Sequence, residues 1–240
     1  MDELRELYEA RAAQQYAAPQ PLPDPRIDRK FGRILELVRA QLPCEAFLDA
    51  GCGDGRYLAA LADELPPRRA GADLSERILE TARARVDADL RQASLEELPF
   101  AAGAFDLVLC SQVIEHVPDA SRAIGELHRV LRPGGTLVIS TDNARNTMTR
   151  ALNAPRTLVV RALRLRGARG RIESPATPYT RDSFRDLLED GGFTVEHLET
   201  FRFHLMWPFA FAPLTRALNA LDARLPAHGA GDIVAAVARR

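Results

Sequence analysis

Cysteine is scarce in this chain of 240 residues. The three cysteines, Cys44, Cys52 and Cys110, are too few and too scattered for a disulfide framework or a zinc site. No pair of histidines or cysteines has the spacing of metal ligands, so we expect no bound metal. A chain without disulfides is typical of a reducing compartment, and we therefore expect a cytoplasmic protein.

Long apolar segments are also missing. No run of about 18 apolar residues occurs, so the pattern predicts no membrane-spanning helix. The first residues, MDELRELYEARAAQQY, are charged and amphipathic and lack the apolar core of a signal peptide. With 46% hydrophobic and 27% charged residues, the composition predicts a folded, soluble protein with a sizeable core.

Acidic residues are absent from one segment, Asn143 to Ile172, which carries eight arginines. The formal net charge is -1, so the rest of the chain is acidic. In RTLVVRALRLR the apolar residues recur at helical spacing, with Arg161 and Arg164 on the opposite side. This predicts either a cover over a pocket with a solvated basic face, or a helix resting on an anionic membrane, aided by the apolar FHLMWPFAFAPL.

Apolar patterns along the chain predict strands and helices in alternation. Helices are expected over 2–17, 26–41, 55–65, 75–86, 120–131 and 180–190. Strands are expected over 44–50, 68–74, 88–94, 104–111, 135–141, 193–201 and 231–240. Such alternation predicts an α/β fold with a mostly parallel sheet and helices on both faces. We expect an N-terminal helical cap over 1–42 and a main domain over 43–240, with an insertion over 143–178.

The stretch FLDAGCGDGRYL places glycines between a predicted strand and a predicted helix. Gly51, Gly53 and Gly55 would allow backbone conformations and a close ligand approach that side chains would block. The spacing D-x-G-x-G-x-G, which begins at Asp49, is neither the dinucleotide fingerprint nor a P-loop. Taken alone, the loop is as well explained by a structural turn as by a ligand site.

A second carboxylate, Asp73, ends the next predicted strand about twenty residues further on. A carboxylate at that place can bind both hydroxyl groups of a ribose. Together with the glycine loop, it predicts a site for a nucleoside-bearing cofactor.

Three further motifs, ASLEELPF, AFDLVLCSQVIEHVPD and ELHRVLRPGGTLVIST, follow in order. From Phe47 to Thr141 the chain resembles the class I S-adenosylmethionine-dependent methyltransferases, especially those that methylate small molecules. Its general plan is similar to that of the ubiquinone-biosynthesis O-methyltransferases. The resemblance implies a Rossmann-like, doubly wound sheet of seven strands with one antiparallel strand, N-terminal helices and a helical insertion after the fifth strand. It also implies S-adenosylmethionine as cofactor and S-adenosylhomocysteine as product.

The resemblance also assigns roles to residues on the methionine and ribose side of the site. Asp49 would orient the methionine ammonium, directly or through water. Gly51 and Gly53 would let the chain pass beneath the methionine and ribose. Asp73 would bind the ribose hydroxyls.

On the adenine side, Leu74 would pack on the base, and Ser94 and Leu95 would present polar groups to its edge. Ser94 stands where the family often has aspartate, but a hydroxyl can also accept a hydrogen bond. Cys110 and Ser111 would offer backbone carbonyls to the ammonium, and the Cys110 thiol itself is expected to be a small buried apolar group.

For an oxygen acceptor, the protein must also remove a proton, and histidine is suited to that near neutral pH. His116, in IEHVPD just beyond the fourth strand, is the best placed of the five histidines. The alternative is that His116 only bonds to the local backbone at a helix start. His204 is a second candidate base, and His128 is expected to be structural or solvated.

The leading interpretation is methyl transfer to oxygen of a small acceptor, with lipophilic molecules among the candidates; nitrogen and carbon are less favoured. RNA methylation is a rival, because the basic segment could contact phosphates. However, SQVIEH lacks the Asn/Asp-Pro-Pro-aromatic loop of amino-group methylases of nucleic acid bases, so a nucleic-acid partner is disfavoured. A cofactor-binding subunit without catalysis would carry the same cofactor residues.

Overall fold

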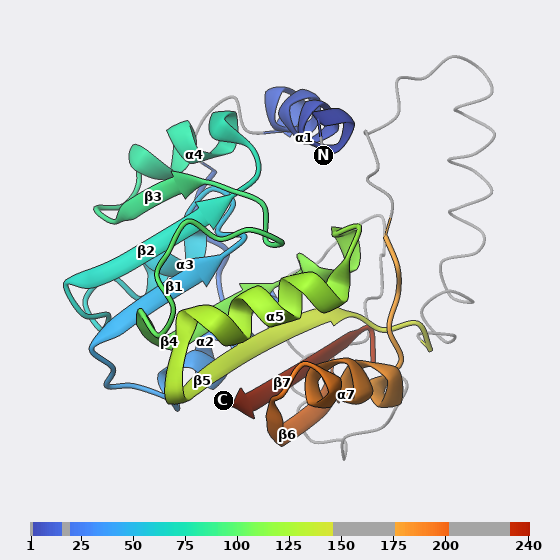
Figure 1. Cartoon of the computed structure of the whole chain (residues 1–240). Helices are drawn as coiled ribbons and strands as arrows, with labels where there is room; N and C mark the ends of the chain where they lie inside the picture. Colours follow the sequence, from blue (N-terminus) through green and yellow to red (C-terminus); the bar gives the residue numbers. More distant parts are fainter. Residues whose placement is uncertain (1, 16–19, 146–175, 202–230) are drawn as a thin grey trace, which may run out of the picture.

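The computed structural model describes residues 2–15, 20–145, 176–201 and 231–240. They contain one seven-stranded sheet in the order β3-β2-β1-β4-β5-β7-β6 (Figure 1). Its strands are β1 (Ala46–Ala50), β2 (Arg68–Asp73), β3 (Asp89–Gln92), β4 (Phe105–Ser111), β5 (Leu131–Asp142), β6 (Thr194–Phe201) and β7 (Ile233–Arg239). Only β7 among these strands runs antiparallel to its neighbours. The predicted seven-stranded, mostly parallel α/β fold is confirmed.

Helices flank the sheet. They are α1 (Asp2–Gln15), α2 (Arg29–Arg39), α3 (Arg56–Ala60), α4 (Glu76–Arg83), α5 (Ala120–Val130) and α7 (Arg181–Asp190), with a short 3-10 helix η1 (Ile114–His116). Four of these helices have an N-cap residue whose side chain accepts a hydrogen bond from the backbone N–H three residues further on. These N-cap residues are Asp28, Ser75, Asp119 and Thr180. Such caps satisfy N–H groups that a helix start leaves unpaired.

The two faces of the sheet have separate hydrophobic cores. Ile124 of α5 and Phe184 of α7 are buried on one face, and Ile34 of α2 and Leu58 of α3 on the other. Because the sheet is covered on both sides, β1 is buried along its whole length. All of its residues are apolar except Asp49. An aspartate buried in such a strand calls for a functional explanation.

Two boundaries differ from the sequence expectation by more than three residues. Helix α3 ends at Ala60, earlier than the predicted 55–65, and Leu61 and Leu65 are buried in the turns that follow. Strand β5 begins at Leu131, directly after α5 and four residues before the start of the strand predicted over 135–141. The chain end explains the second difference, because the backbone N–H of Gly134 donates to the carbonyl of Arg240 and the N–H of Arg240 donates to Gly135, both at 3.0 Å.

Several predictions from the sequence fall outside the described residues. They are the arginine-rich helix around 157–166, most of the insertion over 143–178, the apolar segment over 203–214 and His204. Within the described ranges, no helix combines the length and the apolar character needed to cross a lipid bilayer.

Candidate functional site

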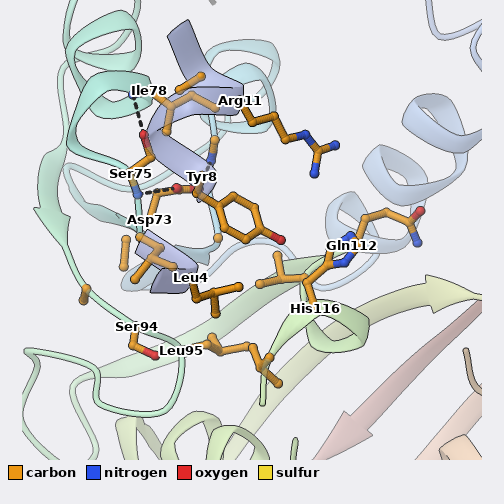
Figure 2. Close-up of a pocket in the computed structure, with 18 of the residues that line it drawn as sticks. Leu4, Tyr8, Arg11, Asp73, Ser75, Ile78, Ser94, Leu95, Gln112 and His116 are labelled. Atoms are coloured by element: carbon orange, nitrogen blue, oxygen red, sulfur yellow. Dashed lines mark hydrogen bonds between the residues drawn. The ribbon is translucent and has the colours of Figure 1, made fainter. Parts of the chain in front are cut away.

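A cavity of about 220 Å³ opens at the carboxyl ends of β1, β2 and β4 (Figure 2). The strand order of the sheet reverses between β1 and β4, and open α/β sheets bind ligands at that point. Six of the nine predicted cofactor residues line this cavity, and so does the predicted base; they are Gly51, Gly53, Asp73, Leu74, Ser94, Leu95 and His116. Asp49, Cys110 and Ser111 do not line it.

The glycine loop forms the floor of the cavity. Two backbone N–H groups, of Gly51 and Cys52, donate to the carbonyl of Ala72 at 2.7 and 2.9 Å and so fix the loop to β2. Gly51 has φ +85° and Gly53 has φ +53°, conformations that residues with a Cβ seldom adopt. A Cβ on Gly51 would also lie 2.2 Å from Cγ2 of Val113. The loop therefore needs glycine at position 51 for both conformation and space.

Asp73 lies at the end of β2, where its carboxylate joins two parts of the site. One oxygen accepts a hydrogen bond from the Gly53 N–H at 2.9 Å and the other from the Ser75 N–H at 3.0 Å. Burial raises the pKa of Asp73, while these backbone donors oppose the rise. Each carboxylate oxygen has a second lone pair, so Asp73 keeps acceptor capacity toward the cavity.

Asp49 is 1% exposed within β1. Its Oδ2 accepts no hydrogen bond from the described part of the chain. Burial, with smaller contributions from Asp73 and Asp54, raises the pKa of Asp49 to about 8. A buried carboxylate of this kind is stabilised by a bound cation. The arrangement fits the role predicted for Asp49, orientation of the methionine ammonium, directly or through water.

The adenine side of the cavity is the loop that follows β3. Ser94 Oγ accepts a hydrogen bond from the Glu96 N–H at 3.1 Å, so the hydroxyl that was expected to face the base also braces its own loop. Leu95 is 6% exposed and belongs to the core. This loop therefore has little freedom where it meets the cavity.

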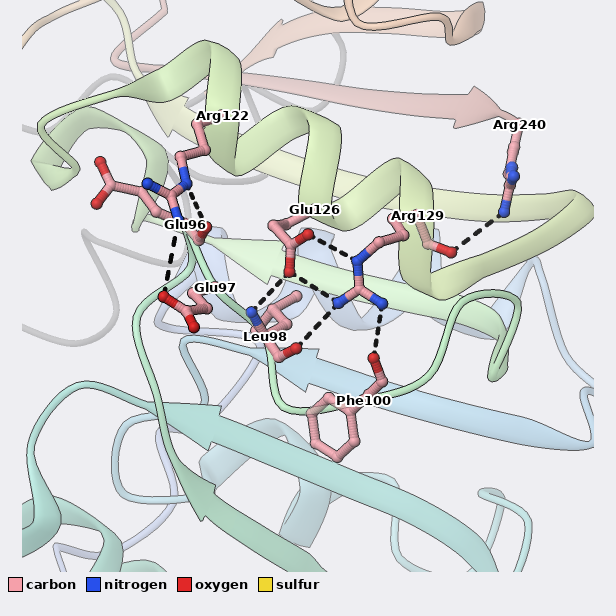
Figure 3. A network of polar contacts seen from close by, with 8 residues as sticks. All are labelled: Glu96, Glu97, Leu98, Phe100, Arg122, Glu126, Arg129 and Arg240. Atoms are coloured by element: carbon pink, nitrogen blue, oxygen red, sulfur yellow. Dashed lines mark hydrogen bonds and ion pairs between the residues drawn. The ribbon is translucent and has the colours of Figure 1, made fainter.

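Side chains of α5 hold the same loop from outside (Figure 3). Glu126 accepts from the Leu98 N–H at 2.8 Å, and Arg129 donates to the carbonyls of Leu98 at 2.9 Å and Phe100 at 2.7 Å. The two side chains also pair with each other at 2.6 Å. Three backbone groups of one loop are thus satisfied by one ion pair.

Two predicted cofactor residues at the end of β4 lie below the cavity. Cys110 is fully buried in the core, and burial raises the pKa of its thiol, as expected of a small apolar residue. The Ser111 hydroxyl lies 3.0 Å from that of Ser140 and 3.4 Å from that of Tyr57. Both side chains serve the packing around the site, and the role assigned to their carbonyls stays a prediction.

His116 ends η1 and lies on the wall of the cavity that faces α1. Its backbone N–H donates to the Val113 carbonyl at 2.9 Å, in agreement with a local structural role, while its ring faces Tyr8 with 6.4 Å between ring centroids. The backbone hydrogen bond uses the N–H of His116 and leaves its ring on the cavity wall, so the structural role does not exclude a catalytic one. The catalytic role of His116 stays a prediction.

The sequence analysis missed the residues of α1. Leu4, Tyr8 and Arg11 line the cavity from this helix, and Figure 2 shows the Tyr8 ring reaching across toward His116. Their only signal in the sequence was an amphipathic helix with an aromatic residue among its charges.

Gln112 was missed as well. It adopts φ +61°, unusual for a residue other than glycine, and its Nε2 is buried without a partner among the described residues. Its Oε1 accepts from Lys30 Nζ at 3.4 Å, which places the one lysine of the chain beside the cavity wall.

Glu115 is buried next to His116. It accepts a hydrogen bond from the Thr141 hydroxyl at 3.1 Å, and burial is the main cause that raises its pKa to about 7. The backbone carbonyl of Glu115 accepts a hydrogen bond from the Thr177 N–H at 2.7 Å, so η1 is tied to the segment that precedes α7.

Comparisons with known proteins agree with this geometry. Residues 48–139 match the family described as methyltransferase domain. A probable S-adenosylmethionine-dependent methyltransferase of Mycolicibacterium smegmatis is 36% identical over 155 residues, which are 62% of this chain and 52% of the relative. A ubiquinone biosynthesis O-methyltransferase of Hahella chejuensis is 40% identical over 114 residues, 44% of this chain and 46% of the relative. The chain spans about half the length of these two relatives.

A solved structure with the same fold is a SAM-dependent methyltransferase of Thermotoga maritima, with a TM-score of 0.63 and 20% identity over 98% of this chain and 99% of the other. The fold and the cavity define an α/β protein built to hold a nucleoside-bearing cofactor at its topological switch point. The matched residues 48–139 are a methyltransferase domain, and the sequence matches support a class I S-adenosylmethionine-dependent methyltransferase.

Proposed function

We propose that this protein transfers the methyl group of S-adenosylmethionine to an oxygen atom of a small, lipophilic acceptor, with His116 as the general base. The observation that carries the proposal is that His116 shares one cavity with Gly51, Gly53 and Asp73. A base must lie within reach of the acceptor's proton, and the acceptor must lie beside the cofactor.

The residues present fit S-adenosylmethionine. Asp49 has a buried carboxylate oxygen without a partner in the described chain, which suits an ammonium group, and Asp73 retains acceptor capacity for ribose hydroxyls. Gly51 and Gly53 line the floor of the cavity without side chains, so a ligand there would lie directly on the backbone. When bound, the cofactor supplies an electrophilic methyl group on a sulfonium, so the protein's task is to align the acceptor, remove its proton and exclude water.

The lining of the cavity supports a small acceptor with an apolar part. Val113, Val117 and Pro118 surround His116, and Leu4 lies opposite them on α1. Apolar walls with a few polar groups are typical of small-molecule sites. The relative of Hahella chejuensis, named for ubiquinone biosynthesis, supports oxygen as the target and a lipophilic acceptor.

A panel of phenolic, enolic and amine acceptors incubated with S-adenosylmethionine tests this proposal through the release of S-adenosylhomocysteine. We expect release with phenols or enols and transfer of a labelled methyl group to oxygen. Binding of S-adenosylhomocysteine without turnover on any acceptor class would support a non-catalytic cofactor-binding subunit instead. Turnover on RNA alone would overturn the choice of acceptor.

The proposal extends to a cytoplasmic enzyme that contacts the inner, anionic face of a membrane. This part rests on the sequence alone, namely on eight arginines without an acidic residue between Asn143 and Ile172. Each basic residue near an anionic surface contributes about 1 kcal/mol. Membrane contact is tested by co-sedimentation of the protein with anionic vesicles at low and high salt. The comparison variant has Arg161, Arg164 and Arg166 changed to Gln. No sedimentation of the parent protein at low salt would contradict membrane contact.

A further inference from the structure

The side chain of Glu9 joins helix α1 to the start of α4, next to the cofactor site. Its carboxylate accepts hydrogen bonds from the Ser75 hydroxyl at 3.1 Å and from the backbone N–H groups of Glu76 at 2.7 Å and Arg77 at 3.4 Å. These groups form the start of α4, where unpaired N–H groups and the helix dipole favour a negative charge. Figure 1 shows α1 lying beside α4.

Apolar packing of α1 is slight. Between Glu3 and Gln14, Ala12 is the one buried residue, whereas α2 buries six of its eleven residues. Most helical stability in proteins comes from packing an apolar face. Since α1 has little of that packing, its attachment depends on polar contacts, among which are the three hydrogen bonds to Glu9.

The residue that binds Glu9 also contacts the predicted ribose ligand, Asp73. Ser75, which donates its hydroxyl to Glu9, donates its backbone N–H to Asp73. On the neighbouring positions of α1, Tyr8 faces His116 and Arg11 lies with its guanidinium carbon 5.9 Å from the Tyr8 ring. Docking of Glu9 on α4 therefore brings Tyr8 and Arg11 over the cavity, and undocking would remove one of its walls.

We propose that Glu9 is a latch that holds α1 closed over the bound cofactor and thereby positions Tyr8 against His116. The inference rests on the proposed function, because it concerns the same cavity. Glu9 is a positioning residue, since it acts through α1 and contacts neither the cavity nor His116. Closing the latch retains the cofactor and completes the wall next to the acceptor; opening it admits the cofactor and releases the product.

The test compares three variants of the full-length chain, Glu9→Ala, Glu9→Gln and Glu6→Ala. Glu6 is an exposed glutamate on the same helix, so Glu6→Ala matches the change in charge and helix propensity. Stopped-flow measurement of S-adenosylhomocysteine dissociation is the main readout. We expect dissociation about tenfold faster in Glu9→Ala, because hydrogen bonds to a charged group are lost, an intermediate rate in Glu9→Gln, which keeps one acceptor oxygen, and the parental rate in Glu6→Ala.

Hydrogen exchange supplies the second readout. In Glu9→Ala saturated with S-adenosylhomocysteine, the amides of α1 should lose protection while those of α2 keep it. A parental dissociation rate in Glu9→Ala, or equal acceleration in Glu6→Ala, would overturn the latch. Parent protein that fails to bind S-adenosylhomocysteine would instead overturn the proposed function, so the two failures are distinguishable.

Discussion

The two walls of the cavity are built in different ways. The cofactor wall consists of backbone and the Asp73 carboxylate at the ends of parallel strands, and hydrogen bonds such as that from Gly51 to Ala72 fix it to the sheet. The opposite wall consists of the side chains of Tyr8 and Arg11 on α1 and His116 on η1, and Glu9 joins α1 to the start of α4. From this difference we expect the first wall to serve cofactor binding and the second, completed by α1, to serve the proposed acceptor.

If the walls divide their tasks in this way, His116→Ala should separate turnover from binding more sharply than any other change. Removal of a general base lowers the rate by about 10² to 10⁴, and the affinity for S-adenosylhomocysteine should stay within about threefold of the parent. Steady-state kinetics and calorimetry measure the two quantities. The control is His197→Ala, a partly exposed histidine on β6 far along the sheet order. Turnover within a few fold of the parent would leave His116 with its backbone role alone.

Asp73→Ala should show the opposite behaviour, because Asp73 belongs to the cofactor wall. The variant loses a charge-assisted contact to the ribose, expected to weaken cofactor binding by about 1.5 to 3 kcal/mol, which is about 10- to 150-fold. The N–H groups of Gly53 and Ser75 also lose their acceptor, so Asp73→Asn serves as the matched variant that preserves shape. Calorimetry with S-adenosylhomocysteine decides it. Parental affinity in a folded Asp73→Ala protein would show that the ribose binds elsewhere.

The two walls also differ in how far the sequence revealed them. The strands, the glycine loop and Asp73 were predictable, because alternating apolar segments and turn residues are local signals. Tyr8, Arg11 and Gln112 were not, because their place depends on how α1 docks through Glu9 and on the positive φ at the end of β4, both of which are long-range outcomes. The early start of β5 at Leu131 was not predictable for the same reason, since the backbone of Gly134 and Gly135 pairs with Arg240, which is distant in the sequence.

The pH dependence of cofactor binding should report on Asp49. Burial, with Asp73 and Asp54, raises the pKa of Asp49 to about 8 from an ordinary value of 3.8, so the carboxyl is largely protonated at pH 6 in the cofactor-free protein. A cofactor ammonium binds the ionised form, and each binding event then releases a proton. Affinity should therefore rise with pH between pH 6 and pH 7, by up to about tenfold.

The same shift has the opposite sign for folding. The unfolded chain gives up the Asp49 proton near pH 4 and the folded chain near pH 8, so the cofactor-free protein should lose stability as pH rises between these values. Calorimetry at pH 6 and pH 7 measures the affinity, and denaturant unfolding measures the stability. Both slopes should flatten in Asp49→Asn, and slopes that survive this substitution would assign them to another group.

The smallest expected effect concerns the brace behind the adenine loop. Arg129→Met keeps the apolar stem but removes the donors to the carbonyls of Leu98 and Phe100 and the partner of Glu126. Since Arg129 meets the cavity lining only through the backbone carbonyl of Leu98, we expect a loosened loop and about a three- to tenfold loss of affinity for S-adenosylhomocysteine, within the range of one or two ordinary hydrogen bonds. The matched control is Arg39→Met, which removes the last residue of α2 from an exposed ion pair with Glu64. It should change the affinity for S-adenosylhomocysteine by less than about twofold. Equilibrium binding of 5′-methylthioadenosine, which keeps the adenine and ribose but lacks the amino-acid part, should fall by the same factor as that of S-adenosylhomocysteine. A loss confined to S-adenosylhomocysteine would place the effect of Arg129 on the methionine side and contradict a brace for the adenine loop.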